Sequence, residues 1–313
     1  MRNRLITIFG GTGFIGGHLV RRLAARGARL LVISRDPAQG ARLQPMGNVG
    51  QIVVERADLG SEAGLGRAID GAFAVINLIG ILYETRRQTF QAIHAELPGR
   101  IAKVAAAAGV QRLVQVSAVG ADPDSASAYA RSKAEGERAV REAFPRATIL
   151  RPSIVVGPRD GFFNRFAAMA RLLPALPLIG GGRTRFQPVY VGDVAEAIVA
   201  ALERDDAPGR TYELGGPRVY SFAELMRYML QVIGRRRLLV PIPFELAMLL
   251  ARLLELAPAP PLTRDQVELL KTDNVIAGDA LTLDLGITPT PIELVVPQYL
   301  ALYRAARVRV VRP

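Results

Sequence analysis

The segment Gly10–Gly16 constrains the fold more than any other part of this sequence. It lies directly between the apolar run Leu5–Phe9 and a segment whose apolar residues recur at helical spacing. Glycine at position 10 permits a tight turn, glycine at 13 lets the backbone approach a pyrophosphate, and glycine at 16 lets the helix pack close to the strand. Strand, turn and helix in this order predict a dinucleotide site at the helix N-terminus. The expected contacts come from Gly10, Thr12, Gly13, Phe14, Ile15 and Gly16.

Short β-branched runs alternate with longer segments of helical period through the first half of the chain. This alternation predicts an α/β fold with a Rossmann-type, doubly wound parallel sheet. The expected strands are Leu5–Phe9, Leu30–Ser34, Gln51–Val54, Ala74–Leu78, Leu113–Ser117 and Thr148–Leu150. The expected helices are Phe14–Arg26, Ala92–Ala108 and Ala128–Ala143.

The amino-acid composition changes after Arg151-Pro152, where proline and glycine become more frequent. We therefore expect a dinucleotide-binding domain over residues 1–155 and a smaller, mostly helical C-terminal lobe over residues 156–313. The pattern of residues 186–204 predicts a strand followed by a helix, and this segment is expected to rejoin the first domain.

The end of the second expected strand indicates which dinucleotide is bound. An acidic side chain here would bind the adenosine ribose of NAD, whereas Ser34 and Arg35 suit a 2′-phosphate. Asp36 follows immediately and leaves NAD(H) as the alternative. The sequence favours NADP(H) over NAD(H).

Three further segments are expected along the cofactor. Asp58 and Leu59 follow the third strand, where the carboxylate would accept from the adenine amine or, equally, cap a helix ahead of Ser61. Gly80 permits a close approach after the fourth strand. The remaining expected cofactor contacts are Leu78, Ile79, Pro152 and Ile154.

Ser117, Tyr129 and Lys133 form a candidate catalytic triad. Ser117 closes the fifth strand, and tyrosine and lysine four residues apart share one face of a helix. A lysine ammonium lowers the pKa of a nearby phenol, so that the tyrosine can transfer a proton while the serine holds a substrate oxygen. Ser117 and Lys133 are also expected to bind the cofactor, since a lysine can hydrogen-bond the nicotinamide ribose.

Composition narrows the classes of function. The chain has no cysteine and two histidines, so no metal site is expected. The net charge of +12 comes almost entirely from arginines spread along the chain, because lysine occurs only at 103, 133 and 271. Nucleic acid is therefore not expected as a partner, and an anionic lipid surface or an acidic protein is favoured.

No uncharged apolar stretch is long enough to span a membrane, and the glycines after Phe9 break a signal-peptide pattern. Residues 238–256 mix leucine-rich faces with the preceding Arg235-Arg236-Arg237. They read as an interfacial segment or as an ordinary core helix. A cytoplasmic protein is expected, peripheral at the cytoplasmic face of the inner membrane if the segment is interfacial.

These features resemble the short-chain dehydrogenase/reductase (SDR) superfamily in its extended or atypical branch. The less generic stretches are similar to the family of the alpha subcomplex subunit 9 of respiratory NADH:ubiquinone oxidoreductase, complex I, and its bacterial relatives. Those stretches are Pro45–Ile52, Val75–Gly80, Phe162–Ala167, Gln187–Val191 and Thr263–Glu268.

The resemblance implies a tightly held, structural NADPH, with Arg35 on its 2′-phosphate and a C-terminal lobe near a quinone site and the membrane surface. Three hypotheses follow: an accessory or assembly component of a quinone-linked membrane complex, an active reductase or epimerase acting on a quinone-like or sugar-like substrate, and a free NADP(H) sensor. The first two differ in whether Phe162, Phe163, Phe166 and Phe186 fill the substrate cavity or line it.

Overall fold

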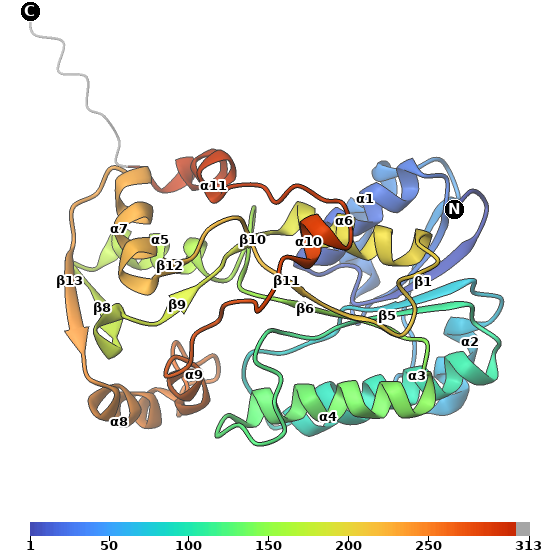
Figure 1. Ribbon diagram of the computed structural model, residues 1–313, viewed down its shortest axis with the longest axis horizontal. Helices are drawn as coiled ribbons and strands as arrows, with labels where there is room; N and C mark the ends of the chain where they lie inside the picture. The colour runs from blue at the N-terminus through green and yellow to red at the C-terminus, as the bar shows by residue number, and fades with distance from the viewer. Residues whose placement is uncertain (305–313) are drawn as a thin grey trace, which may run out of the picture.

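The computed structural model describes residues 1–304, so residues 305–313 of the expected C-terminal lobe lie outside the described part. Its centre is one seven-stranded sheet in the order β11-β6-β5-β4-β1-β2-β3, with every pair parallel. The expected doubly wound Rossmann-type fold is thereby confirmed (Figure 1). The strands of this sheet are β1 (Leu5–Phe9), β2 (Arg29–Ile33), β3 (Ile52–Glu55), β4 (Ala74–Asn77), β5 (Arg112–Val116), β6 (Thr148–Pro152) and β11 (Thr211–Leu214).

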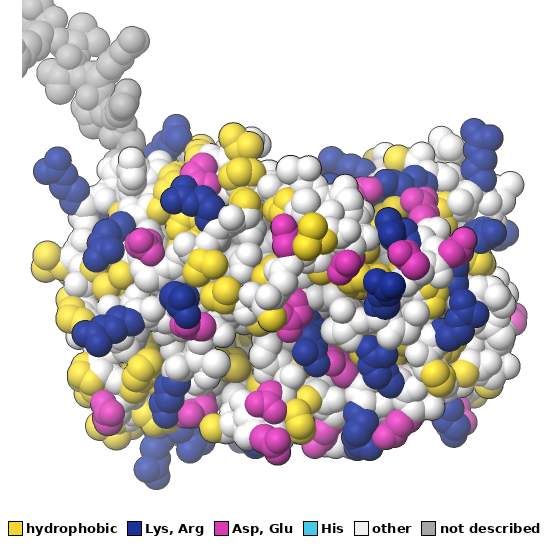
Figure 2. Space-filling view, viewed as in Figure 1, with side chains coloured by type: hydrophobic (Ala, Val, Ile, Leu, Met, Phe, Trp, Pro, Cys, Tyr) yellow, Lys and Arg dark blue, Asp and Glu magenta, His cyan; other side chains and the backbone are white. Residues whose placement is uncertain are grey.

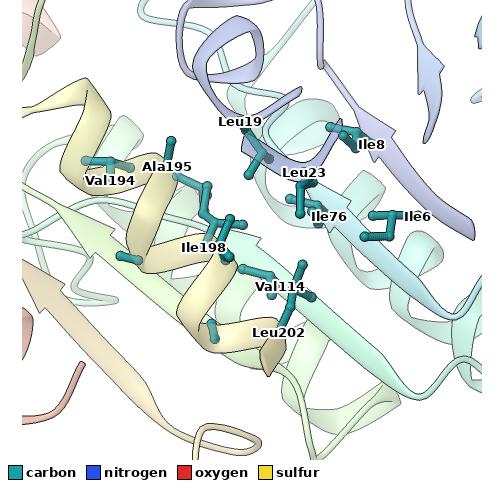
Figure 3. Close-up of a cluster of buried hydrophobic side chains, with 14 of the residues drawn as sticks. Ile6, Ile8, Leu19, Leu23, Ile76, Val114, Val194, Ala195, Ile198 and Leu202 are labelled. Atoms are coloured by element: carbon teal, nitrogen blue, oxygen red, sulfur yellow. The ribbon is translucent and has the colours of Figure 1, made fainter. Parts of the chain in front are cut away.

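Helices cover both faces of this sheet. On one face, α1 and α6 pack against the sheet with a continuous apolar core, part of which Figure 3 shows. On the other face, a second core lies under α2, α3 and α4. The helices of this half are α1 (Phe14–Ala25), α2 (Glu62–Ile69), α3 (Leu97–Ala107), α4 (Ala128–Ala143) and α6 (Val191–Glu203), with short turns η1 (Pro37–Arg42) and η2 (Gln44–Met46).

The expected helix 92–108 is two helices. Residues Gln91–Glu96 form a π-helix, η3, and the α-helix α3 begins only at Leu97. Pro98 in the first turn of α3 has no N–H to donate, so the α-helical hydrogen-bond pattern cannot run back through it. The His94 carbonyl instead packs against Gly136 of α4, where no Cβ would fit.

The C-terminal lobe has its own core and three two-stranded sheets, β10-β7, β12-β9 and β13-β8. Its elements are β7 (Val155–Val156), α5 (Phe163–Leu172), β8 (Ala175–Ile179), η4 (Gly180–Gly182), β9 (Arg185–Phe186), β10 (Val189–Tyr190), β12 (Tyr220–Ser221), α7 (Phe222–Val232), β13 (Leu238–Ile242), α8 (Phe244–Leu254), α9 (Arg264–Leu269), α11 (Ile292–Leu300) and η5 (Ala301–Tyr303). Helix α10 (Ala280–Leu283) instead packs on β11, and its Leu281 belongs to the core of the main sheet.

Segment 186–204 departs in part from the expectation that it rejoins the first domain. Helix α6 packs on α1 and the main sheet, but strand β10 pairs with β7 outside that sheet. The place beside β6 is taken by β11, which the sequence did not single out. The edge position explains this, because a strand paired on one side needs few apolar residues.

Candidate functional site

The glycine turn joins β1 to α1 at the carboxyl edge of the sheet. Gly10 has a φ of 78°, a conformation that L side chains rarely adopt, and its amide donates to the Ile33 carbonyl at 3.1 Å. A Cβ at Gly16 would overlap the backbone of Gly11, so only glycine lets α1 begin this close to the turn. Helix α1 starts at Phe14 with no side-chain cap, which leaves the first amides of the helix for an anion.

The adenosine end of the site brings Thr12 beside Ser34, with their hydroxyl oxygens 3.0 Å apart. Arg35 is exposed and forms no ion pair or hydrogen bond with the described residues. The carboxylate of Asp36 accepts from the Ala38 amide and the Gln39 side chain as the cap of η1. The oxygens of the Asp36 carboxylate are thus engaged by η1, whereas the donors of the Arg35 guanidinium are unused within the described residues.

Arg42 is a residue that the sequence did not single out. Its guanidinium donates to the carbonyl of Thr12 in the glycine turn, thirty positions earlier in the chain. A second cation therefore lies at the adenosine end. No local pattern marks it, because the contact depends on how η1 folds back over the turn.

Asp58 lies at the start of the loop after β3. Its carboxylate accepts from the Gly60 amide at 2.9 Å and from the Ser61 hydroxyl at 2.8 Å, and Ser61 in turn caps α2. These two bonds hold the pKa of Asp58 below its usual range. The structure thus shows the helix-start role of Asp58, while an adenine contact for Asp58 and Leu59 stays a prediction.

The loop after β4 carries Leu78, Ile79 and Gly80 past the glycine turn. A Cβ at Gly10 would lie 3.3 Å from Ile79, so the two loops pack closely. A Cβ at Gly80 would lie 3.5 Å from the Lys133 Nζ. Lys133 therefore faces the same loop that was expected to pass beside the cofactor.

The three residues of the expected triad lie at this edge of the sheet. Ser117 follows β5, and its Oγ is buried with no hydrogen-bond partner in the described structure. An unpartnered buried hydroxyl costs free energy unless a ligand supplies the partner. The Lys133 Nζ lies 5.7 Å from the centroid of the Tyr129 ring. Ser117, Tyr129 and Lys133 fit a nicotinamide nucleotide, and the contact of each with the nucleotide stays a prediction.

Burial shifts both titratable members of the triad. It lowers the pKa of Lys133 to about 8, against the attraction of Glu137. Burial, with the Asp265 carboxylate nearby, raises the pKa of Tyr129 to about 12. The phenol is therefore harder to ionise than a free tyrosine.

His94 links the loop after β4 to helix α4. Its Nε2 accepts from the Ile81 amide at 3.0 Å, so Nδ1 carries the proton and donates to the Ser132 hydroxyl at 3.1 Å. Its ring stacks on Phe90 and meets the edge of Tyr129. Burial lowers the pKa of His94 to about 3 and keeps it neutral. No sequence pattern predicted these bridging bonds, because they join segments that are distant in the chain.

Pro152 and Ile154 lie at the end of β6, on the remaining side of the site. The Pro152 carbonyl accepts from the Val119 amide at 3.0 Å, which joins the loops after β5 and β6. The Ile154 amide donates to the Asn274 side chain at 3.1 Å. Asn274 belongs to the C-terminal lobe and is another contributor that the sequence did not reveal.

The four phenylalanines whose role was open pack mainly against one another and against Phe222. Phe162 lies 5.1 Å from Phe163, 5.5 Å from Phe166 and 6.2 Å from Phe186, measured between ring centroids. Phe163 and Phe186 are buried in the core of the lobe. This packing agrees better with aromatics that fill space than with aromatics that line an open cavity.

Within residues 1–304, no helix is both long and apolar enough to cross a membrane.

The similarity to known proteins supports a bound nicotinamide nucleotide. Residues 6–215 match the NAD dependent epimerase/dehydratase family. The chain is 39% identical over 311 residues to the mitochondrial NADH dehydrogenase (ubiquinone) 1 alpha subcomplex subunit 9 of Arabidopsis thaliana, covering 95% of this chain and 77% of that protein.

Two further similarities widen the comparison. The ceramide reductase of Caulobacter vibrioides is 34% identical over 242 residues, covering 76% of this chain and 74% of the reductase. The triphenylmethane reductase structure from Citrobacter sp. superposes with a TM-score of 0.76 at 21% identity, covering 94% and 99% of the two chains. At that identity the superposition supports the fold alone.

Proposed function

We propose that this chain, which belongs to the NAD dependent epimerase/dehydratase family and, within it, to the family of the complex I alpha subcomplex subunit 9, holds NADP(H) as a structural nucleotide. In this proposal the chain serves as an accessory, assembly or quinone-linked component of a respiratory-type membrane complex. The nucleotide belongs to residues 1–155, and the lobe that follows provides the surface for the partner.

The choice of NADP(H) is supported by the charges at the adenosine end. Arg35 is exposed and free of ion pairs among the described residues, and Arg42 lies over the glycine turn. Asp36, the residue that favoured NAD(H), has its carboxylate turned into the η1 cap. Two guanidinium groups suit the 2′-phosphate dianion.

Residues 117, 129 and 133 would hold the nicotinamide end. The Lys133 ammonium would donate to the ribose hydroxyls, and the Ser117 hydroxyl would gain the partner that it lacks. When bound, the nucleotide supplies hydride chemistry.

Helix α8 carries the main argument for a partner surface. It packs inward through Ala247 and Ala251, both buried, and turns its leucines outward. Leu246, Leu249 and Leu253 are 48%, 57% and 61% exposed. A helix of a free globular protein normally does the reverse, so a leucine face of this size indicates a contact with lipid or protein.

Exposed arginines lie on α8 and just before β13. Arg252 is exposed on α8, and Arg236 is exposed just before β13, whose Leu238 is also exposed. Apolar and basic side chains lie next to one another at this end of the molecule in Figure 2. Leucines beside arginines suit an anionic bilayer surface, the interfacial alternative for residues 238–256. We therefore place the chain at the cytoplasmic face of the inner membrane.

The experiment substitutes Leu249→Gln and Leu253→Gln together and measures binding to vesicles with and without anionic lipid. Each leucine contributes roughly 1.5 kcal/mol or more when buried, so binding should fall at least tenfold. The matched control is Leu283→Gln with Leu294→Gln, since these leucines are at least as exposed, at 79% and 63%, but lie on α10 and α11. Equal vesicle binding by both double variants would contradict the assignment of the surface.

A second function, an active NADPH-dependent reductase or epimerase, is favoured by one observation. The buried Ser117 Oγ has no partner in the described structure, as expected of a group that polarises a substrate carbonyl. The similarity to a ceramide reductase supports the same possibility. Steady consumption of NADPH with quinone-like or ceramide-like ketones, abolished by Tyr129→Phe without loss of nucleotide affinity, would establish this function and refute the structural one.

A further inference from the structure

Residues 263–276 of the C-terminal lobe, which we call the strap, run along the loops that surround Lys133. The strap begins with α9, whose Thr263 and Gln266 cap each other's backbone and fix the first turn. Figure 1 shows α9 between α8 and the loop that leads into α4. The strap contains the Thr263–Glu268 motif, for which the cofactor site by itself gives no role.

Asp265 caps a helix that belongs to the other half of the molecule. Its carboxylate accepts from the Ala128 amide at 2.6 Å, the Ser127 hydroxyl at 2.9 Å and the Tyr129 amide at 3.3 Å. These groups form the first turn of α4, where unpaired amides and the helix dipole favour a negative charge. Since α4 carries Tyr129 and Lys133, the position of both depends on a side chain from the strap.

The strap also contacts the loops that follow β4, β5 and β6. The Gln266 side-chain Nε2 donates to the Leu82 carbonyl at 3.3 Å, and the Asn274 side-chain Nδ2 donates to the Val119 carbonyl at 3.4 Å. Ser153 donates to the Asn274 Oδ1 at 2.6 Å. Among residues 1–304, none of the strap's hydrogen bonds reaches the glycine turn or residues 34–42. Of the two ends of the expected nucleotide site, the strap therefore contacts only the nicotinamide end within the described residues.

The same strap supports the leucine face of α8. Val267 of α9 packs with Ala247 and Ala251, the buried residues of α8. Arg264 pairs with Glu255, just after α8, at 2.8 Å. One segment thus contacts the nicotinamide side through one set of residues and the proposed partner surface through another.

We infer that Asp265 is a positioning residue through which the nicotinamide end of the bound nucleotide and the α8–α9 surface stabilise each other. This inference rests on the proposed NADP(H) binding. The strap fixes the first turn of α4 for the nicotinamide end, and by thermodynamic reciprocity the bound nucleotide holds α8 and α9 in place. The adenosine end, which the strap does not touch, is independent of it.

The test compares two ligands on Asp265→Ala. Affinity for NADPH should fall about fivefold, the typical equilibrium effect of losing a helix cap. Affinity for 2′,5′-ADP, which lacks the nicotinamide half, should change by less than about twofold. Asp265→Asn keeps one acceptor and should recover part of the loss. The matched control is Glu268→Ala, which removes a carboxylate from the same helix that pairs only with Lys271 on the surface.

Hydrogen exchange provides the reciprocal measurement. NADPH should slow the exchange of amides 244–269 in the parent chain and in Glu268→Ala, but not in Asp265→Ala. Equal weakening of both ligands in Asp265→Ala would show a general loss of structure and overturn the inference. Unchanged NADPH affinity with unchanged protection would overturn it as well. Failure of the parent chain to bind NADPH would overturn the proposed function together with the inference.

Discussion

Replacing Arg35 by alanine tests the assignment of the 2′-phosphate site. The Arg35 guanidinium is exposed and unpaired within the described residues, so its removal breaks no internal contact. A hydrogen bond to a charged group contributes about 1.5–3 kcal/mol, and each 1.4 kcal/mol is tenfold in affinity. NADPH affinity should therefore fall roughly tenfold to hundredfold, while NADH affinity stays the same.

Arg42→Ala should have a smaller effect. Its guanidinium already donates to the Thr12 carbonyl, so part of its hydrogen-bonding capacity is used within the protein. We expect a loss of about threefold to tenfold for NADPH. Added salt should reduce both effects, because the site is exposed and the interaction is screened.

The assay is direct titration with NADPH and NADH. The chain contains no tryptophan, so the fluorescence of the reduced nicotinamide can be followed without overlap from indole emission. Arg138→Ala is the control, since Arg138 is an exposed arginine on α4 that pairs only with Glu142. An unchanged ratio of NADPH to NADH affinity in Arg35→Ala would refute the assignment.

Three further predictions concern pH and backbone geometry. The pKa of Lys133 is lowered to about 8, so its ammonium loses its charge as the pH rises from about 7 to about 9, and the affinity for NADPH should fall. NADPH titrations of Lys133→Met should show no such pH dependence. Burial lowers the pKa of His94 to about 3, so below about pH 6.5 the unfolded chain binds more protons than the folded one. The free energy of unfolding should therefore fall by up to about 1.4 kcal/mol for each unit by which the pH is lowered through this range. Denaturant titrations of His94→Asn should show a weaker dependence of the unfolding free energy on pH. Gly16→Ala should lose at least about tenfold in NADPH affinity, because its Cβ would displace the Gly11 backbone; affinity equal to that of the parent would show that the turn does not hold the pyrophosphate.

The features that sequence predicted well are local. The core strands from β1 to β6 lie within a residue or two of their expected bounds, because buried β-branched runs and the turns between them are determined by neighbouring residues. Helix α4 spans Ala128–Ala143 as expected, since Ser127 caps it and its buried residues follow the helical period. The glycine turn Gly10–Gly16 could also be predicted, because it too is determined by neighbouring residues.

The features that sequence did not reveal depend on distant contacts. Asp265 caps a helix whose first residues lie more than a hundred positions away, and no spacing rule connects them. Strand β11 was missed because Glu213 interrupts its apolar pattern and pairs with Arg151 at the edge of the sheet. The adenine role expected of Asp58 stays a prediction, and the structure shows the capping role that the sequence left equally open.

The nucleotide content of the native protein tests the central claim most directly. The chain, isolated from its own cells without added nucleotide, is denatured, and the released compounds are identified and counted by mass spectrometry. A structural NADP(H) predicts close to one NADP(H) per chain. Release of NAD(H) in its place, or of no nucleotide from correctly folded protein, would contradict the account.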